Sequence, residues 1–426
     1  MRRRIWGWYF FDWASQPFST LLMTFIFAPY IARILGDGAT AQTVWGYGLA
    51  VTGAIIAVAS PLLGAVADRA GGHMRFLVVF SVMYVAGSWG LWWAAPDDPR
   101  LIWTLVCFGI GMIGMELATV FTNALLPGLA GRAEMGRISG SGWAFGYLGG
   151  LVALMLMLLV FQTADPPFGL DPAAEEGTRV AGPLTAIWYL VFMIPFFAFV
   201  RGGAAPQGPI GPALRQAWPD LRASLSRLPG QRSLVAFLAS SMLYRDALNG
   251  IYAFGGIYAV GVLGWEVRDV GIFGILAALS GAVFAWIGGR ADSRFGPRPV
   301  IATCLIALIL AAAAVVAIGP GTVFGFATDL GTPLFFALGA VIGAAGGAVQ
   351  AASRTMVLDQ ADPARMTEAF GLFALSGKAT AFLAPLLIGI ATQISGSQRI
   401  GIVPVIALFL GGLILLCWVK PHRAAR

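Results

Sequence analysis

The chain has 426 residues, of which 58% are hydrophobic and only 11% are charged, and its mean hydropathy is +0.81. A soluble domain carries about 25% charged residues, so this composition excludes a water-soluble globule and indicates an integral membrane protein. The net charge of +7 does not require a nucleic-acid partner, because basic residues gather on the cytoplasmic loops of membrane proteins. We therefore expect membrane lipids, and no nucleic acid, around this protein.

The apolar residues fall into runs of roughly 20, the length of a helix that crosses a bilayer. Strict two-residue alternation is absent, which argues against a membrane β-barrel. The first run is too long for a cleavable signal and is followed by no small-residue cleavage site. We therefore predict an all-α membrane protein with twelve spans, at residues 8–35, 43–66, 75–95, 101–127, 138–162, 183–201, 233–263, 269–289, 299–318, 333–355, 367–393 and 400–419.

The longest polar break divides these spans into six and six. It predicts an N-terminal six-helix bundle at 1–201, a cytoplasmic central loop at 202–232, and a C-terminal six-helix bundle with a short tail at 233–426. With both termini in the cytoplasm, twenty Lys and Arg residues fall on the cytoplasmic side and four on the opposite side. The positive-inside rule favours this orientation. We expect a multi-pass monomer in the cell (inner) membrane.

Ionisable residues inside membrane spans are costly, and each is a candidate functional group. The first is Asp12, in the stretch FFDWASQPF, with Gln16 one turn later on the same helix face. Pro17 can loosen the helix there and expose backbone carbonyls. Asp12 is about 12 Å along a helix that starts at Arg4. A helix cap or a pair with the neighbouring bundle therefore remains an alternative to a place on the substrate or gating path.

Four deeper charges follow along the chain: Glu116 in span 4, Arg245 and Asp246 in span 7, and Lys378 in span 11. Each could instead serve helix packing. Adjacent helical residues differ by about 100°, so Arg245 and Asp246 cannot both face one point. The four charges sum to zero, which suits a zwitterion. Lys378 or Arg245 would meet its carboxylate, and Glu116 or Asp246 its ammonium group.

Neutral polar side chains inside the spans can complete such a site. Asn123 and Arg354 lie near the cytoplasmic ends of spans 4 and 10, where they could instead form an inner gate or cap helices. The candidates for direct contact with a solute are Gln16, Asn123, Asn249, Tyr252 and Gln350.

The coupling ion depends on which groups can titrate inside the membrane. Both histidines lie outside the predicted spans, so a carboxylate must carry a coupling proton, and burial favours its protonated form. Glu116 and Asp246 are the candidates. Sodium coupling and an uncoupled facilitator remain open.

Catalytic motifs do not emerge from the sequence. It contains no phosphate loop, no histidine-based triad and no metal-ligand cluster, and its glycine-rich stretches lie in apolar helices. We expect a protein that is not an enzyme and that needs no cofactor or metal.

An internal repeat links the two halves. GAVADRAGGHMR (64–75) joins spans 2 and 3, and GGRADSRFGPRP (288–299) joins spans 8 and 9, with the two aspartates 224 residues apart. Glycine lets helices approach closely, and the arginines hold the loop in the cytoplasm. The residues of this gating-loop motif are Gly64, Asp68, Arg69 and Arg75 in the first copy and Gly288, Asp292, Arg294 and Arg298 in the second.

This repeat resembles the loop motif of the major facilitator superfamily. The resemblance covers the whole chain: twelve spans, two halves of six, a long central loop and the motif in both halves. It implies two pseudo-symmetric six-helix bundles that rock about a central site.

Three longer stretches resemble the vacuole-effluxer branch, the family of the autophagy-linked vacuolar amino-acid exporter. They are 11–30, 121–150 and 349–385. The chain departs from the family pattern where Phe11 replaces a tyrosine before Asp12 and where Ala247 replaces a glycine after Asp246. The resemblance implies a secondary active transporter of a small polar solute, an amino acid among the candidates, with proton-coupled efflux. The alternatives are a drug or metabolite exporter, a lipid-handling transporter of the same fold, and a sensor without transport.

Overall fold

The structure is a computed structural model, and it describes residues 2–70, 73–125, 129, 132–200, 211–212, 215, 219, 222, 226, 230–360, 373, 376–377 and 379–420. Within these ranges, the side chains at 61–62, 64–65, 67–70, 73, 124, 132–140, 293 and 358 are not described.

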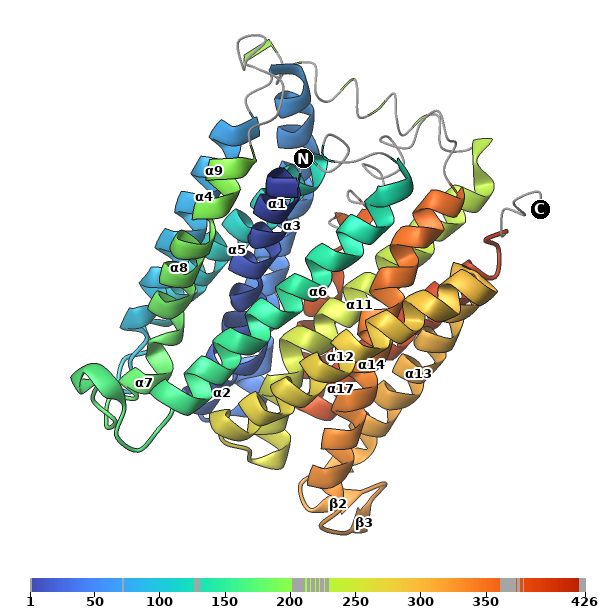
Figure 1. The fold of residues 1–426 in the computed structure, drawn as a ribbon. Coiled ribbons are helices and arrows are strands. Elements are labelled where there is room, and N and C mark those ends of the chain that lie inside the picture. Colours follow the sequence, from blue (N-terminus) through green and yellow to red (C-terminus); the bar gives the residue numbers. More distant parts are fainter. Residues whose placement is uncertain are drawn as a thin grey trace.

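Helices make up almost all of the described chain (Figure 1). The N-terminal half contains α1 (Arg2–Pro17), η1 (Phe18–Phe25), α2 (Phe27–Leu35), α3 (Gly38–Ala70), α4 (His73–Gly90), η2 (Leu91–Trp93), α5 (Leu101–Ala124), α6 (Arg132–Leu156), η4 (Met157–Phe161), η5 (Pro167–Gly169), α7 (Glu176–Arg179), α8 (Ala181–Phe192) and α9 (Ile194–Phe199). The C-terminal half contains α11 (Arg232–Leu263), α12 (Val267–Phe295), α13 (Pro297–Ala317), β1 (Ile318–Gly319), β2 (Thr322–Val323), β3 (Phe326–Ala327), α14 (Gly331–Gln360), α16 (Leu383–Ser395) and α17 (Gln398–Leu416).

Eleven helical segments of the described residues are long and apolar enough to cross a membrane. They match eleven of the twelve predicted spans, which confirms the all-α membrane fold. The predicted span at 367–393 is represented mainly by α16, a helix of 13 residues. Most of its first part lies outside the described residues. The domain boundaries after residues 201 and 232 stay predictions.

The start of α1 and the end of α17 lie at one end of the molecule, called here the terminal end (Figure 1). The opposite, distal end carries α7 and a small sheet that the sequence did not predict. Its antiparallel strands pair in the order β1-β2-β3, with Ile318 opposite Val323. The turns place Gly321 and Gly325 at φ values of 61° and 82°, a region that favours glycine.

The first span is not one regular helix. Pro17 ends α1, residues 18–25 continue as a π-helix, and α2 begins after Ile26. Proline lacks the N–H that would extend the regular hydrogen-bond ladder. The π-helix instead continues with wider bonds, such as Ile26 N–H to the Leu21 carbonyl at 3.0 Å. The expectation that Pro17 loosens this helix agrees with that geometry.

Glycines set the distances between helices inside each half. Lipid tails are as apolar as leucine, so membrane helices associate through close packing instead of hydrophobic exclusion. On α14, an added Cβ at Gly347 would meet the Gly281 carbonyl of α12 at 2.3 Å. On α4, an added Cβ at Gly87 would meet the Gly111 nitrogen of α5 at 2.3 Å. These helix pairs therefore lie backbone against backbone.

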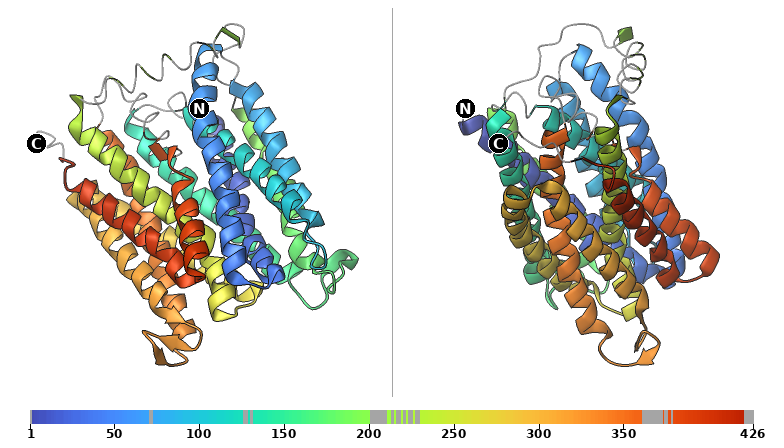
Figure 2. Two further views of the ribbon diagram at one scale, coloured as in Figure 1. Left: turned by 180° about the vertical axis from the view of Figure 1, so that it is seen from behind. Right: turned by 90° about the vertical axis from the view of Figure 1, so that its right-hand side faces the viewer.

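The two halves meet chiefly toward the distal end among the described residues. There α3 runs beside α16, as the view from behind also makes visible (Figure 2). A Cβ at Gly53 would meet the Phe382 backbone at 2.9 Å. Gln42 Nε2 donates to Thr392 Oγ1 at 2.6 Å, and Gln398 Nε2 donates to Gln42 Oε1 at 3.4 Å. We call Gln42, Thr392 and Gln398 the distal amide cluster.

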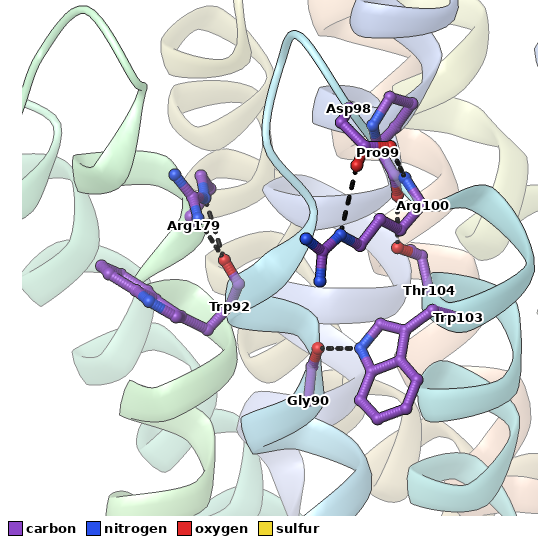
Figure 3. Close-up of polar contacts among 8 residues, drawn as sticks. All are labelled: Gly90, Trp92, Asp98, Pro99, Arg100, Trp103, Thr104 and Arg179. Atoms are coloured by element: carbon purple, nitrogen blue, oxygen red, sulfur yellow. Dashed lines mark hydrogen bonds and ion pairs between the residues drawn. The ribbon is translucent and has the colours of Figure 1, made fainter.

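Hydrogen bonds also hold the distal connection between α4 and α5 (Figure 3). Trp103 Nε1 donates to the Gly90 carbonyl at 2.9 Å. Arg179 of α7 donates from Nε and Nη2 to the Trp92 carbonyl at 2.9 and 2.7 Å, with its guanidinium 4.9 Å from the Trp92 ring centre. Arg100 donates to Asp98 at 3.2 Å. The distal surface of the N-terminal half is thus fixed by polar contacts.

The start of α3 is capped by Asp37, which lies outside the membrane spans. Its carboxylate accepts hydrogen bonds from the Thr40 side chain and from the Thr40 and Ala39 backbone N–H groups. Those hydrogen bonds, the Thr40 side-chain bond first, hold the pKa of Asp37 below its usual value.

Substituting Gly343 tests the close packing of α14 on α12. An added Cβ there would overlap the Ala277 carbonyl, so Gly343→Ala is expected to lower the free energy of unfolding by about 1–3 kcal/mol. A Cβ at Gly289 of α12 meets no atom within 4 Å, so Gly289→Ala is the matched control. Unfolding in detergent, followed by intrinsic fluorescence, measures both. Equal stability of the two variants would contradict this packing.

Candidate functional site

The middle of α11 presents a polar face. Arg245, Asn249 and Tyr252 follow one another at helical spacing, so they share one side of the helix. Asn249 is exposed although it lies in the middle of a membrane span. Polar groups at this depth face the bundle interior or a water-filled cavity. This polar face makes α11 the first candidate for lining a solute site.

Helix α14 lies against α11, and two contacts fix their relative position. The Tyr244 and Ser353 hydroxyls are 2.7 Å apart. About two turns further along α11, the Tyr252 hydroxyl lies against Gly346, where any side chain would overlap it. The two helices therefore run antiparallel. Gln350 of α14 falls between these contacts.

Each of these two helices carries an arginine whose guanidinium lies on an aromatic ring. The Arg245 guanidinium carbon is 4.4 Å from the Phe373 ring centre, and its Nη1 donates to the Phe373 carbonyl at 3.1 Å. The Arg354 guanidinium carbon is 5.0 Å from the ring centre of Trp143, on α6 of the other half. Arg354 was predicted near the end of span 10. It lies near the end of the membrane span Gly331–Val357, and α14 continues past it to Gln360.

Asp12 faces the same region from α1. It packs against α6 where glycines leave room: a Cβ at Gly142 would be 2.7 Å from its carboxylate, and one at Gly146 would be 3.2 Å from its Cβ. Its carboxylate attracts the Arg354 guanidinium. Since α1 already begins at Arg2, Asp12 does not cap that helix, and the cap alternative is wrong. The alternative of a pair with the neighbouring bundle fits this geometry.

A neutral pair also joins the two halves. The Tyr147 side chain of α6 hydrogen-bonds the Gln350 side chain of α14. Tyr147 also lies near Tyr252 of α11. We call the side chains that meet here the central polar cluster, which comprises Asp12, Tyr147, Arg245, Asn249, Tyr252, Gln350 and Arg354.

Asp246 points away from this cluster toward α16. It is 2% exposed, and its Oδ2 accepts the Ala384 N–H at 2.8 Å. Ala384 lies in the first turn of α16, whose N–H groups need acceptors from outside the helix. Neither Asp246 Oδ1 nor Thr380 Oγ1 has a hydrogen-bond partner among the described residues. This arrangement agrees with the expectation that the side chains of Arg245 and Asp246 face different directions.

The other sequence candidates lie around the cluster or outside it. Glu116 is partly buried on α5 beside Met115, whose sulfur contacts the Ser19 hydroxyl at 3.6 Å. A Cβ at Gly150 of α6 would meet Gln16 Cγ at 2.8 Å, so Gln16 packs on that helix. Asn123 is exposed at the end of α5. Lys378 lies outside the described residues.

The second copy of the loop motif packs α12 on α14. A Cβ at Gly288 would meet the Ala348 side chain at 2.8 Å, and the buried Asp292 accepts a hydrogen bond from the Thr355 side chain. Arg294 lies near the Phe295 ring, and Arg298 donates to the Cys417 carbonyl at 3.1 Å. In the first copy, Arg75 is exposed, and the surroundings of Gly64, Asp68 and Arg69 lie outside the described part.

Sequence reasoning missed Trp143, Tyr147 and Phe373. Each is an aromatic residue in an apolar run, a pattern that also describes ordinary core or lipid-facing positions. For Trp143 and Tyr147 the available signal was the glycine spacing in SGSGWAFGYLGG, which marks α6 as a closely packed helix.

This architecture is the fold of the major facilitator superfamily. A D-xylose-proton symporter superimposes with a TM-score of 0.70 at 14% identity, over 99% of this chain and 97% of that one. The nucleoside transporter NupG gives 0.63 at 15% identity, over 99% of this chain and 100% of that one. At such identities the likeness establishes the fold.

Sequence comparison then gives the family. Residues 31–426 match the family described as "Vacuole effluxer Atg22 like", and the chain belongs to it. The "Uncharacterized MFS-type transporter YxiO" of Bacillus subtilis (strain 168) is 24% identical over 425 residues, 98% of this chain and 95% of YxiO. Autophagy-related protein 22-1 of Aspergillus niger is 22% identical over 302 residues, 68% of this chain and 48% of the relative. The chain thus spans about half of that fungal relative. By their names, YxiO and the two solved structures are transporters and not enzymes.

Two substitutions at Asp246 test its contact with α16. Asp246→Ala leaves the buried Ala384 N–H without an acceptor, which is expected to cost about 1–3 kcal/mol of unfolding free energy. Asp246→Asn keeps an acceptor oxygen and should retain most of the stability. Unfolding in detergent measures both, and equal losses in the two variants would show that the hydrogen bond to α16 contributes nothing.

Proposed function

We propose that the protein is a secondary active transporter that moves a small polar solute, an amino acid first among the candidates, by alternating access. The single observation that carries this proposal is the central polar cluster, because its members come from both halves. Asp12 and Tyr147 belong to one half, and Arg245, Gln350 and Arg354 to the other. A solute bound there would be released when the halves rock apart.

The distal contacts support a closed state on one side. The distal amide cluster and the glycine contacts between α3 and α16 join the halves at that end. If both termini are cytoplasmic, as the charge distribution favours, the distal end faces outward. The state described would then face inward, and transport would require the distal contacts to separate.

Proton-coupled efflux is the form of transport that we propose. Asp246 is a buried carboxylate, and no ion pair to it occurs among the described residues. An uncompensated charge of this kind is strongly disfavoured in a low-dielectric interior. Binding and release of a proton by Asp246 would therefore change how firmly it holds α16. Glu116 is the second candidate.

A lipid-handling transporter receives less support. It would need a lateral opening between the two halves. The apolar groove of about 760 Å³ that is lined by Val78, Trp103, Leu190 and Phe197 lies within the N-terminal half, between α4, α5, α8 and α9. It therefore supplies no path between the halves.

Reconstitution into proteoliposomes tests the proposed function. We expect uptake or release of at least one amino acid when a proton gradient is imposed, and no comparable movement of sugars or hydrophobic drugs. Separate sodium and proton gradients identify the coupling ion. Movement of sugars or drugs without movement of any amino acid would refute the proposed substrate class.

Neutralising Asp246 tests the coupling role. Asp246→Asn keeps an acceptor for α16 but cannot carry a proton, so gradient-driven transport is expected to fall about 10-fold or more. Exchange of labelled for unlabelled solute without a gradient should persist. Asp98→Asn, which removes an exposed carboxylate paired with Arg100 at the distal end, is the matched control. Unchanged gradient-driven transport in Asp246→Asn would exclude Asp246 as the proton carrier.

A further inference from the structure

We propose that Arg245 and Arg354 together form an anion subsite that binds a carboxylate of the transported solute. The inference rests on the proposed transport function and narrows its substrate class to solutes with a free carboxylate. The geometry points to these two side chains because they belong to facing helices in fixed register and lie on aromatic rings from two further segments.

The register of α11 and α14 brings the two arginines to the same level. The Tyr244 and Ser353 hydroxyls meet at 2.7 Å. Arg245 and Arg354 each follow these residues by one position, about 100° further round their helices. The contact of Tyr252 with Gly346 sets the same antiparallel register further along. Because the helices run in opposite directions, these equal rotations carry both guanidiniums to the same side of the contact between α11 and α14.

Each guanidinium is held on the face of an aromatic ring. The guanidinium carbon of Arg245 lies 4.4 Å from the Phe373 ring centre, and that of Arg354 lies 5.0 Å from the Trp143 ring centre. A ring attracts a cation through its quadrupole and brings no net charge. The Phe373 carbonyl accepts one N–H of Arg245. A guanidinium has five N–H donors, and its fork geometry matches a carboxylate.

The charges of the described side chains favour an added anion. The two guanidiniums are close enough to repel one another, and Asp12 attracts Arg354. The Asp246 carboxylate follows Arg245 directly but turns to the Ala384 N–H. Two cations thus share the region that Asp12 faces. A solute carboxylate between them would relieve their repulsion and would be bound by charge-assisted hydrogen bonds.

Asp12 then gains a second role in the same site. When a solute carboxylate attracts Arg354, Asp12 becomes available to the ammonium group of a zwitterion. Arg354, earlier a gate candidate, thereby joins Arg245 in the role of carboxylate ligand, which sequence reasoning gave to Lys378 or Arg245. An amino acid has a carboxylate for the two arginines and an ammonium group for Asp12, whereas an amine or a sugar has at most one of these groups.

The test compares ligands that differ only at the carboxylate. The purified protein is first screened with the twenty L-amino acids for thermal stabilisation in detergent. The amino acid with the largest effect is then compared with its amino alcohol and its methyl ester, which lack the anionic group. We expect stabilisation and transport by the acid and about 10- to 100-fold weaker binding of both analogues.

Arginine substitutions test which side chains bind the carboxylate. Arg245→Gln and Arg354→Gln are expected to weaken binding of the acid about 10- to 100-fold and to leave the weak binding of the amino alcohol unchanged. Arg290→Gln is the matched control, because Arg290 also lies over an aromatic ring, 3.4 Å from the Trp286 ring centre, but on an exposed part of α12. Arg354→Lys keeps the charge without the fork and should give an intermediate affinity.

The outcomes separate this inference from the proposed function. Equal binding and transport of the acid, the alcohol and the ester would overturn the anion subsite and leave the transporter intact. Arginine variants that fold normally and bind the acid like the parent would overturn it too. Carboxylate-dependent stabilisation without movement of any solute under any gradient would support the subsite and refute transport.

Discussion

The cost of placing charge in a bilayer constrains this protein more than any other factor. An ion in hydrocarbon has no water to solvate it, so each charged side chain must find its partners inside the protein. Arg245 finds an aromatic face and a carbonyl, Arg354 an indole ring and Asp12, and Asp246 a helix N-terminus. These partners come from helices that are distant in the sequence. The charged residues therefore specify how the helices are arranged, besides any part they take in transport.

Close helix packing is what makes these partnerships possible. Asp12 fits between α1 and α6 only because α6 carries Gly142 and Gly146 where α1 crosses it. The Tyr252 hydroxyl sits against α14 only because position 346 is a glycine. Small residues thus perform two tasks at once: they give lipid-embedded helices enough contact to associate, and they leave room for polar side chains between them.

Much of the fold could be predicted from the sequence, because the length and hydropathy of a membrane span are local properties. The predicted span 233–263 differs from α11 by one residue at its start. The small sheet at 318–327 and the π-helix after Pro17 could not be predicted, since both depend on backbone geometry that hydropathy does not encode. For the site, the charged members were found through their cost in the membrane. Trp143, Tyr147 and Phe373 were missed, because only the packing of distant helices distinguishes them from other aromatic residues.

The distal amide cluster has a thermodynamic consequence for any movement of the two halves. Its buried members, Gln42, Thr392 and Gln398, are uncharged, and they join the halves through a few hydrogen bonds. Such a bond contributes only about 0.5–1.5 kcal/mol net, since water can replace either partner when the surfaces part. Separation would therefore exchange protein contacts for hydration at little net cost, without stranding an ion in a dry interface. A closure of this kind is weak enough for the modest binding energy of a small solute to reverse, turnover after turnover.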